Sequence, residues 1–206
     1  GYFAMQWSLG NDFDTASTKV NNLKLPPVTA KQQETQGTIR LRPLLENEIA
    51  RKLVSVEDFQ DRSTVTILGD GLFESGSAQI QDQYYPVLAR VSQALDSVEG
   101  QIVVTGYTDD KPIQSLNFPS NWHLSQARAD AVKEILLNYI KNGGTRIRSE
   151  GRGSTDPVAP NNTLENRAKN RRVEITLFTT GTGPKLGRAV EVKTNTSTTQ
   201  PNSDVN

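Results

Sequence analysis

The sequence of 206 residues has no cysteine, and its only histidine is His123. The absence of cysteine excludes a disulfide framework, a thiol nucleophile and every metal site with cysteine ligands. A single histidine also excludes metal centres and catalytic sites that need several histidines. We expect neither a metal ion nor a cofactor in this protein.

An excess of charge of one sign is also lacking, because 23 lysines and arginines balance 23 aspartates and glutamates. A neutral chain has no overall basic field to attract nucleic acid or an anionic membrane surface. No stretch approaches the roughly 18 to 20 apolar residues of a membrane-spanning helix. Hydrophobic residues make up only 34% of the chain, so we expect part of it to lie outside a packed core.

The two ends of the chain differ from its centre. Residues 1–38 start with an aromatic-rich stretch, have their first positive charge at Lys19 and continue as a polar segment around Pro26 and Pro27. A scarcity of basic residues is typical of the non-cytoplasmic flank of a membrane helix, so we expect a juxtamembrane segment and linker here. A frayed chain end explains the same residues equally well. Residues 181–206 are too polar to offset the entropy of ordering and should form a disordered tail.

The central part alternates between helical and strand-like patterns. Apolar residues at helical spacing predict helices at residues 39–52, 80–98, 121–142 and 164–169. Alternating or continuous apolar runs predict strands at residues 101–107, 146–152 and 172–178, and a hairpin at residues 54–59 and 64–68.

This order of elements predicts an α+β sandwich. We expect a mixed four-stranded sheet with helices on one face. A helix and hairpin at residues 39–63 should form an N-terminal extension, and residues 64–180 should form the main domain.

The loop after the 101–107 strand is the first candidate binding site. In open α/β sheets, ligands lie beyond the carboxyl ends of strands, and this loop brings Asp109 there. The helix that begins near Ser120 or Asn121, both good cap residues, carries Arg128 at the edge of its apolar face. Such an arginine needs a partner, which is either Asp109 or a bound carboxylate.

An aspartate and an arginine beside a helix start complement a zwitterion. The carboxylate accepts hydrogen bonds from an ammonium group, the guanidinium binds a carboxylate, and the helix dipole favours the anion. The simpler alternative is a salt bridge between Asp109 and Arg128 that only holds the loop to the helix. The spacing by itself favours this alternative.

Two other charged groups suggest weaker hypotheses. Residues 167–172 carry four positive charges, but Arg172 opens the last strand, so a charged strand edge that supports the cleft is favoured over a phosphate or nucleic-acid site. Asp109, Asp110 and Glu74 suggest a glycan hydrolase, but adjacent carboxylates point in different directions, so we do not expect an enzyme.

Residues 69–74 resemble a dinucleotide-binding motif only superficially, because the final glycine is missing; a loop explains these glycines better.

Four ordered motifs resemble a known family. Residues 106–113, 118–129, 151–158 and 170–175 are similar to the OmpA C-terminal-like peptidoglycan-binding domain. The forms at 109–113 and 118–122 resemble the branch of the flagellar motor protein MotB and of type VI secretion proteins. The linker with residues 44–49 and 71–78 resembles the periplasmic extension of an inner-membrane TssL (IcmH/DotU-type) protein.

The resemblance implies a periplasmic domain of an inner-membrane-anchored protein that clamps the diaminopimelate of the peptidoglycan stem peptide without cutting it. Asp109 would bind the amino group and Arg128 the carboxylate. The family's motif assigns the cleft lining to Tyr107, Thr108, Asn121 and Leu124, and its support to Arg172. The segment from Asp109 to Asn121 is longer than in the plain outer-membrane form, so the cleft rim can differ.

Other subunits of the secretion complex are implied as partners, and a homodimer is left open. The remaining alternative is a protein–protein scaffold with a vestigial cleft.

Overall fold

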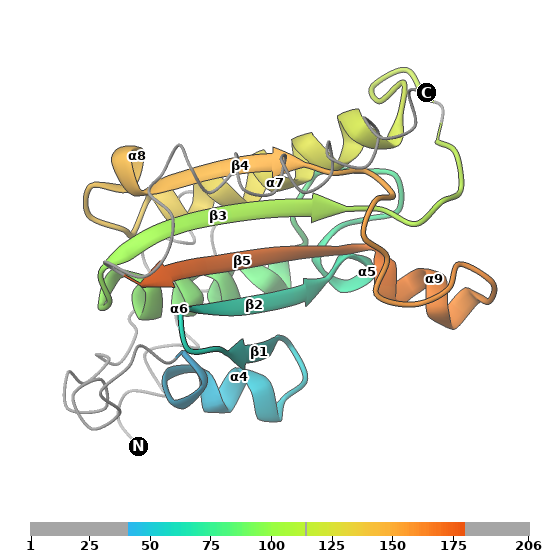
Figure 1. Cartoon of the computed structure of the whole chain (residues 1–206). Helices are drawn as coiled ribbons and strands as arrows, with labels where there is room; N and C mark the ends of the chain where they lie inside the picture. Colours follow the sequence, from blue (N-terminus) through green and yellow to red (C-terminus); the bar gives the residue numbers. More distant parts are fainter. Residues whose placement is uncertain (1–40, 114, 180–206) are drawn as a thin grey trace, which may run out of the picture.

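The computed structural model describes residues 41–113 and 115–179 (Figure 1). The segment predicted at residues 1–38 and the tail predicted at residues 181–206 lie outside these ranges. Among the residues that are described, no helix has the length and apolar character needed to cross a membrane.

A five-stranded mixed sheet forms the centre of the fold, with the strand order β1-β2-β5-β3-β4. Of the strands in the described part of the chain, β3 and β4 alone pair in parallel; the other neighbours are antiparallel. The strands are β1 (Ser55–Asp58), β2 (Arg62–Leu68), β3 (Gly100–Tyr107), β4 (Ile147–Gly151) and β5 (Arg172–Thr179).

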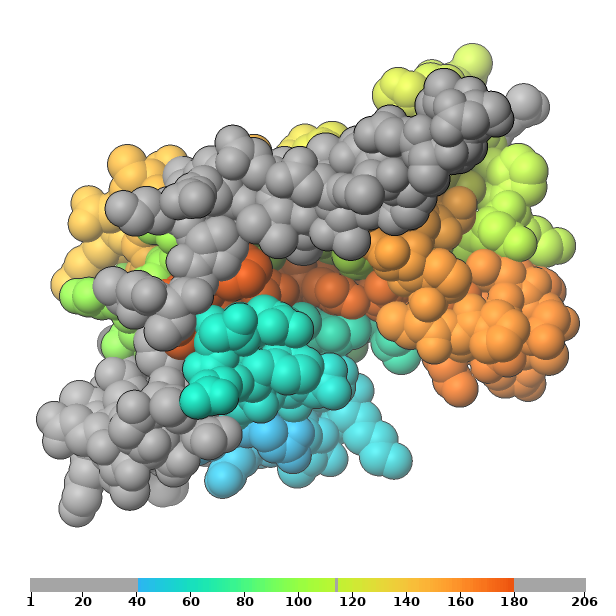
Figure 2. All heavy atoms as spheres, in the orientation of Figure 1, coloured from blue at the N-terminus to red at the C-terminus, as the bar shows by residue number. Residues whose placement is uncertain are grey.

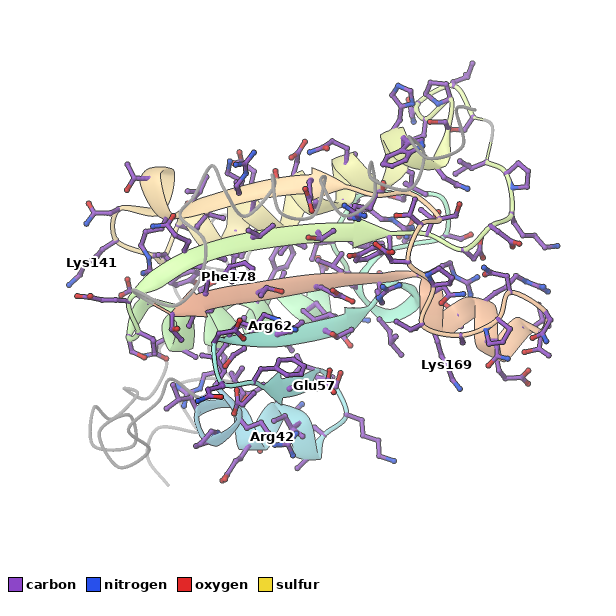
Figure 3. The ribbon with its side chains drawn as sticks, in the orientation of Figure 1. Arg42, Glu57, Arg62, Lys141, Lys169 and Phe178 are labelled. Carbon is purple, nitrogen blue, oxygen red and sulfur yellow. The ribbon has the colours of Figure 1, made fainter. Side chains whose placement is uncertain are left out.

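The mixed sheet is confirmed, but the expected number of four strands is wrong. The hairpin of β1 and β2 is not an appendage, because β2 pairs with β5 along its whole length, from Arg62 opposite Phe178 to Leu68 opposite Arg172. Figure 3 labels Arg62 and Phe178 beside each other on these two strands. The sequence pattern identified the hairpin but could not reveal this long-range pairing.

The long helices α6 and α7 pack on one face of the sheet, as predicted (Figure 1). Alternate residues of the strands, such as Ile102, Val104, Ile175 and Leu177, form one buried core with apolar residues of these helices. The described helices are η1 (Arg42–Leu45), α4 (Glu46–Ala50), α5 (Gly69–Leu72), η2 (Asp82–Tyr84), α6 (Tyr85–Asp96), α7 (Asn121–Leu137), α8 (Gly143–Arg146) and α9 (Leu164–Asn170).

Some helix boundaries differ from the predicted ones. The helix predicted from residue 80 begins as η2 at Asp82, because Ile80 forms an isolated β-bridge with Phe73. The helix predicted to reach residue 142 ends at Leu137, and the glycines expected to close it start α8 instead. The short α5 was not predicted, since four residues are too few to show a helical period.

The N-terminal elements share the core of the rest of the fold. Leu41, Leu44 and Leu45 are buried in the same hydrophobic cluster as the sheet. The Asp58 carboxylate accepts hydrogen bonds from the Leu41 amide (2.9 Å) and the Ser63 hydroxyl (2.7 Å). The predicted boundary at residues 63 and 64 lies inside β2, so the described part of the predicted extension is structurally continuous with the main domain.

A pair of glycines fixes the start of α7 against the sheet. Gly106 and Gly151 face each other on β3 and β4. A Cβ atom on Gly106 would lie 2.3 Å from the Ser125 carbonyl oxygen, and one on Gly151 would lie 2.4 Å from the Gln126 amide nitrogen. Any larger residue would push the helix away, so these glycines set the position of the first turns of α7 relative to the end of β3.

Candidate functional site

The candidate site lies where the carboxyl end of β3, the first turns of α7, the start of β5 and the short α5 meet. The segments that border it, residues 108–120 and 152–170, lie at the same end of the molecule (Figure 2). The α7 helix begins with a Ser120 cap, whose hydroxyl accepts a hydrogen bond from the His123 amide. The cap expected from the sequence is therefore formed.

Asp109 is largely buried and has two partners. Its Oδ1 atom accepts a hydrogen bond from the Lys111 amide (3.0 Å), which closes a tight turn in the loop. Its Oδ2 atom accepts one from Nη1 of Arg171 at 2.5 Å. The carboxylate is thus held in a fixed orientation, and its ionic partner is Arg171.

The loop around Asp109 is tied to its neighbours on both sides. The Thr108 amide donates to the Gly153 carbonyl (2.7 Å), and its hydroxyl donates to the Asp109 carbonyl (2.8 Å). From α7, the Asn121 side-chain amide donates to the carbonyls of Lys111 (2.9 Å) and Asp109 (3.4 Å). Thr108 and Asn121 therefore hold the loop that presents Asp109.

Arg128 is buried, with 5% of its surface exposed, as its position at the edge of the apolar face predicted. Its Nε atom donates to the Ser77 carbonyl (2.7 Å) and Nη2 donates to the Glu74 carbonyl (3.1 Å). The guanidinium also lies over the ring of Phe73, 4.7 Å from its centroid. Leu124, one turn earlier on α7, is buried beside it.

The third nitrogen of Arg128, Nη1, has no acceptor among residues 41–113 and 115–179. Burial lowers the pKa of Arg128 to about 10, while the charges of Asp70 and Asp109 act to raise it. The group therefore remains a cation at neutral pH. The salt bridge between Asp109 and Arg128 favoured by the spacing is not formed, because Arg171 takes that place.

Two residues of the site were missed by the sequence analysis, Arg171 and Asp70. Arg171 donates through Nε and Nη2 to the two oxygens of Asp70, both at 2.8 Å. These hydrogen bonds lower the pKa of Asp70. The sequence did point to Arg171, since this residue lies within the family motif at 170–175 and next to Arg172. It did not point to Asp70, because the role of Asp70 depends on where α5 lies in space.

Arg172 and Tyr107 form a stack on the opposite face of the sheet from α7. Arg172 lies over the Tyr107 ring, and its nitrogens donate to the Glu174 carboxylate (2.8 Å) and to the carbonyls of Asn170 and Asp156. Burial raises the pKa of Tyr107. Because successive side chains of a strand point to opposite faces, this stack supports the end of β3 from behind.

The basic run at residues 167–172 does not form one patch. Arg171 and Arg172 are paired with carboxylates, and Lys169 projects from α9 into solvent (Figure 3). Buried Asn170 accepts hydrogen bonds from the amides of Val158 and Ala159. The end of α9 therefore fixes the loop before β5. This arrangement is consistent with the predicted charged strand edge.

The arrangement as a whole is a pair of opposite charges held by rigid elements. In the described parts of the chain, no group of three or more aspartate, glutamate or histidine side chains is placed to hold a metal ion. The cation of Arg128 and the carboxylate of Asp109 lie within electrostatic reach of each other without forming an ion pair.

Comparisons with known proteins show what the chain as a whole is similar to. The sequence pattern of the OmpA family matches residues 72–171. The fold is similar to the structure described as the cell wall anchor of the type VI secretion system from Pseudomonas aeruginosa, with a TM-score of 0.65 and 50% identity. That match covers 68% of this chain and 97% of the other.

The chain is also similar to curated proteins by sequence. Motility protein B of Bacillus subtilis is 34% identical over 138 residues, which are 66% of this chain and 51% of that protein. The peptidoglycan-binding protein ArfA of Mycobacterium bovis is 35% identical over 121 residues, 57% of this chain and 35% of that protein. This chain thus spans about half of one relative and about a third of the other.

Proposed function

Because the chain belongs to the OmpA family, we propose that it binds peptidoglycan non-covalently, without cleaving it, and anchors an inner-membrane secretion complex to the cell wall from the periplasm. The similarity to a structure described as a cell wall anchor and to a protein named as peptidoglycan-binding supports this proposal. The extension of a TssL-type protein is the context we propose for the domain.

The observation that carries the proposal is Nη1 of Arg128, which has no acceptor among the described residues and lies within electrostatic reach of the fixed carboxylate of Asp109. The two other nitrogens of Arg128 are held by backbone carbonyls of Ser77 and Glu74, so the guanidinium does not need to be ordered on binding. A ligand that supplies a carboxylate to Nη1 and an ammonium to Asp109 would give each of these groups a charged hydrogen-bond partner. The side-chain end of meso-diaminopimelate in the stem peptide has this chemistry.

This mode of binding would select the type of stem peptide. A stem with lysine has the side-chain ammonium but lacks the carboxylate, so Nη1 of Arg128 would be desolvated without an acceptor. An unsatisfied buried donor costs about 1–3 kcal/mol, which corresponds to a loss of affinity of roughly fivefold to 150-fold.

A sacculus pull-down tests the proposal. Sacculi with diaminopimelate should retain the wild-type protein and lose the Asp109→Ala and Arg128→Ala variants, each checked for folding by circular dichroism. Asp110→Ala is the matched control, because Asp110 is exposed and adjacent to Asp109, and it should bind as the wild type does. Equal retention of all four proteins would overturn the proposed site.

The second candidate is a protein–protein module of the secretion machine. It is favoured by exposed apolar side chains on the two segments that border the site and on the first turn of α7, namely Leu116, Val158, Leu164 and Trp122. Other subunits of the complex, or a second copy of this chain, would cover such residues.

Release of soluble fragments from dye-labelled sacculi, abolished by Asp109→Asn, would instead indicate a glycan hydrolase.

A further inference from the structure

One guanidinium group joins two carboxylates that come from different elements. Arg171 binds both oxygens of Asp70, on α5, through Nε and Nη2, and one oxygen of Asp109 through Nη1. The Gly69 amide also donates to the Arg171 carbonyl (2.7 Å), which holds α5 beside the start of β5. Among the residues that the structure describes, the Asp70 carboxylate pairs with Arg171 alone, yet it lies within the electrostatic reach of Arg128 as well.

The four charged side chains of this cluster are balanced. Asp70 and Asp109 contribute two negative charges, and Arg128 and Arg171 contribute two positive ones. The neighbouring ion pair, between Arg172 and Glu174, is balanced within itself. A zwitterionic ligand can therefore enter without leaving a net charge in a partly buried site, where an uncompensated charge is costly.

Arg171 is a competitor of the ligand. It already donates to Asp109, the acceptor that the proposed function assigns to the ligand's ammonium group. Because Asp70 engages two of the three nitrogens of Arg171, only Nη1 is left for Asp109. Without the negative charge of Asp70, the planar fork of Arg171 could turn to bind both oxygens of Asp109, which is the preferred geometry of an arginine–carboxylate pair.

We propose that Asp70 is a positioning residue that sets the ligand selectivity of the cleft. By holding Arg171, it keeps Asp109 available to an ammonium group, so that the site prefers a zwitterionic end over a carboxylate alone. This inference rests on the proposed function and adds to it a residue that has no direct contact with the ligand.

The test compares two stem tripeptides by isothermal titration calorimetry. One ends in meso-diaminopimelate, and the other carries 2-aminopimelate, which keeps the side-chain carboxylate but lacks its ammonium group. Wild type should prefer the first. Asp70→Asn should weaken binding of the diaminopimelate peptide by about tenfold, the loss of one charge-assisted hydrogen bond, and should leave the aminopimelate peptide bound as well as before or better.

Three variants separate positioning from a merely structural role. Asp70→Glu keeps the charge and should keep the preference. The double variant Asp70→Asn with Arg171→Gln removes both the guanidinium that competes for Asp109 and the carboxylate that holds it. It should therefore recover the preference for diaminopimelate that Asp70→Asn alone loses. The matched control is Asp156→Asn, which removes the exposed carboxylate paired with Arg152 and should change neither affinity.

The outcomes distinguish the inference from the function on which it rests. If wild type prefers diaminopimelate and Asp70→Asn keeps that preference, or loses affinity equally for both peptides, the role of Asp70 is overturned and the proposed function stands. Failure of the double variant to recover the preference also overturns that role. If wild type binds neither peptide, or binds both equally, the proposed role of Asp109 falls, and the inference falls with it.

Discussion

Arg172 lies over the ring of Tyr107, with its Cζ atom 3.8 Å from the ring centroid. The two residues are direct partners on β5 and β3, so the stack joins the strand that leads to Asp109 with the strand that begins directly after Arg171. A change in this pair would loosen the ends of both strands without removing either proposed ligand contact.

We predict that Arg172→Ala lowers the free energy of unfolding by about 2–4 kcal/mol, because it removes a buried cation–π contact and the donors of three hydrogen bonds. Urea denaturation measures this. Arg62→Ala is the matched control: Arg62 also lies over a ring, that of Phe59, and pairs with Asp61, but 40% of its side chain is exposed. Arg62→Ala should lower the free energy of unfolding by about 1 kcal/mol or less. Equal losses for both variants would contradict the view that burial makes the contacts of Arg172 the stronger ones.

The close packing of α7 on the sheet gives a second prediction. Gly106→Ala should destabilise the protein by about 3 kcal/mol or more, because its Cβ would collide with the backbone oxygen of Ser125, which cannot move without shifting the helix. The same shift would displace Arg128, which lies on α7, relative to Asp109 and abolish retention on sacculi.

Gly144→Ala is the control for this prediction. A Cβ atom on Gly144 would meet nothing within 4 Å, so alanine should be neutral or stabilise the protein by up to about 1 kcal/mol. Thermal unfolding of both variants checks the pair. A Gly106→Ala protein as stable as Gly144→Ala would show that the helix is not held by this contact.

The elements that the sequence predicted well are those with a local signal. The apolar periods of β3 and α7 placed the loop with Asp109 and the inward position of Arg128. The family resemblance then assigned their roles. The pairing of β2 with β5 could not be read locally, because their residues are about 110 positions apart and alternate like those of any half-buried strand.

The partners of the charged residues were predicted less well, for a physical reason. The choice of Asp109 between Arg128 and Arg171 depends on α5, a single turn that brings Asp70 to Arg171 and the carbonyl of Glu74 to Arg128. Ion-pair partners are decided by a few ångströms of side-chain reach, whereas spacing along the chain specifies only the element and its face.

The ion pair of Asp70 predicts a pH dependence of stability. Hydrogen bonds from Arg171 lower the pKa of Asp70 below its usual value, so the contribution of this group is present above the unfolded pKa, near 4, and is lost as the pH falls through the lower folded value. Because 56% of the side chain is exposed, we expect no more than about 1 kcal/mol.

Urea denaturation of wild type and Asp70→Asn should therefore differ by up to this amount at pH 7 and converge as the pH falls through the lowered pKa of Asp70. Asp61→Asn, which removes the exposed pair with Arg62, controls for the loss of a surface charge. A difference between wild type and Asp70→Asn that grows on acidification would contradict the prediction.

Arg128→Lys separates the charge of Arg128 from its geometry. Lysine keeps the cation but cannot reach the carbonyls of Ser77 and Glu74 and a ligand carboxylate together, since it lacks the planar fork. We predict a loss of about 1–3 kcal/mol of stability and a fall of roughly tenfold to 100-fold in affinity for the diaminopimelate tripeptide. Arg146→Lys is the matched control, because Arg146 also donates to backbone carbonyls, those of Gly100 and Val98. It should lose similar stability and keep full affinity; if both variants bind equally well, the free nitrogen of Arg128 has no part in recognition.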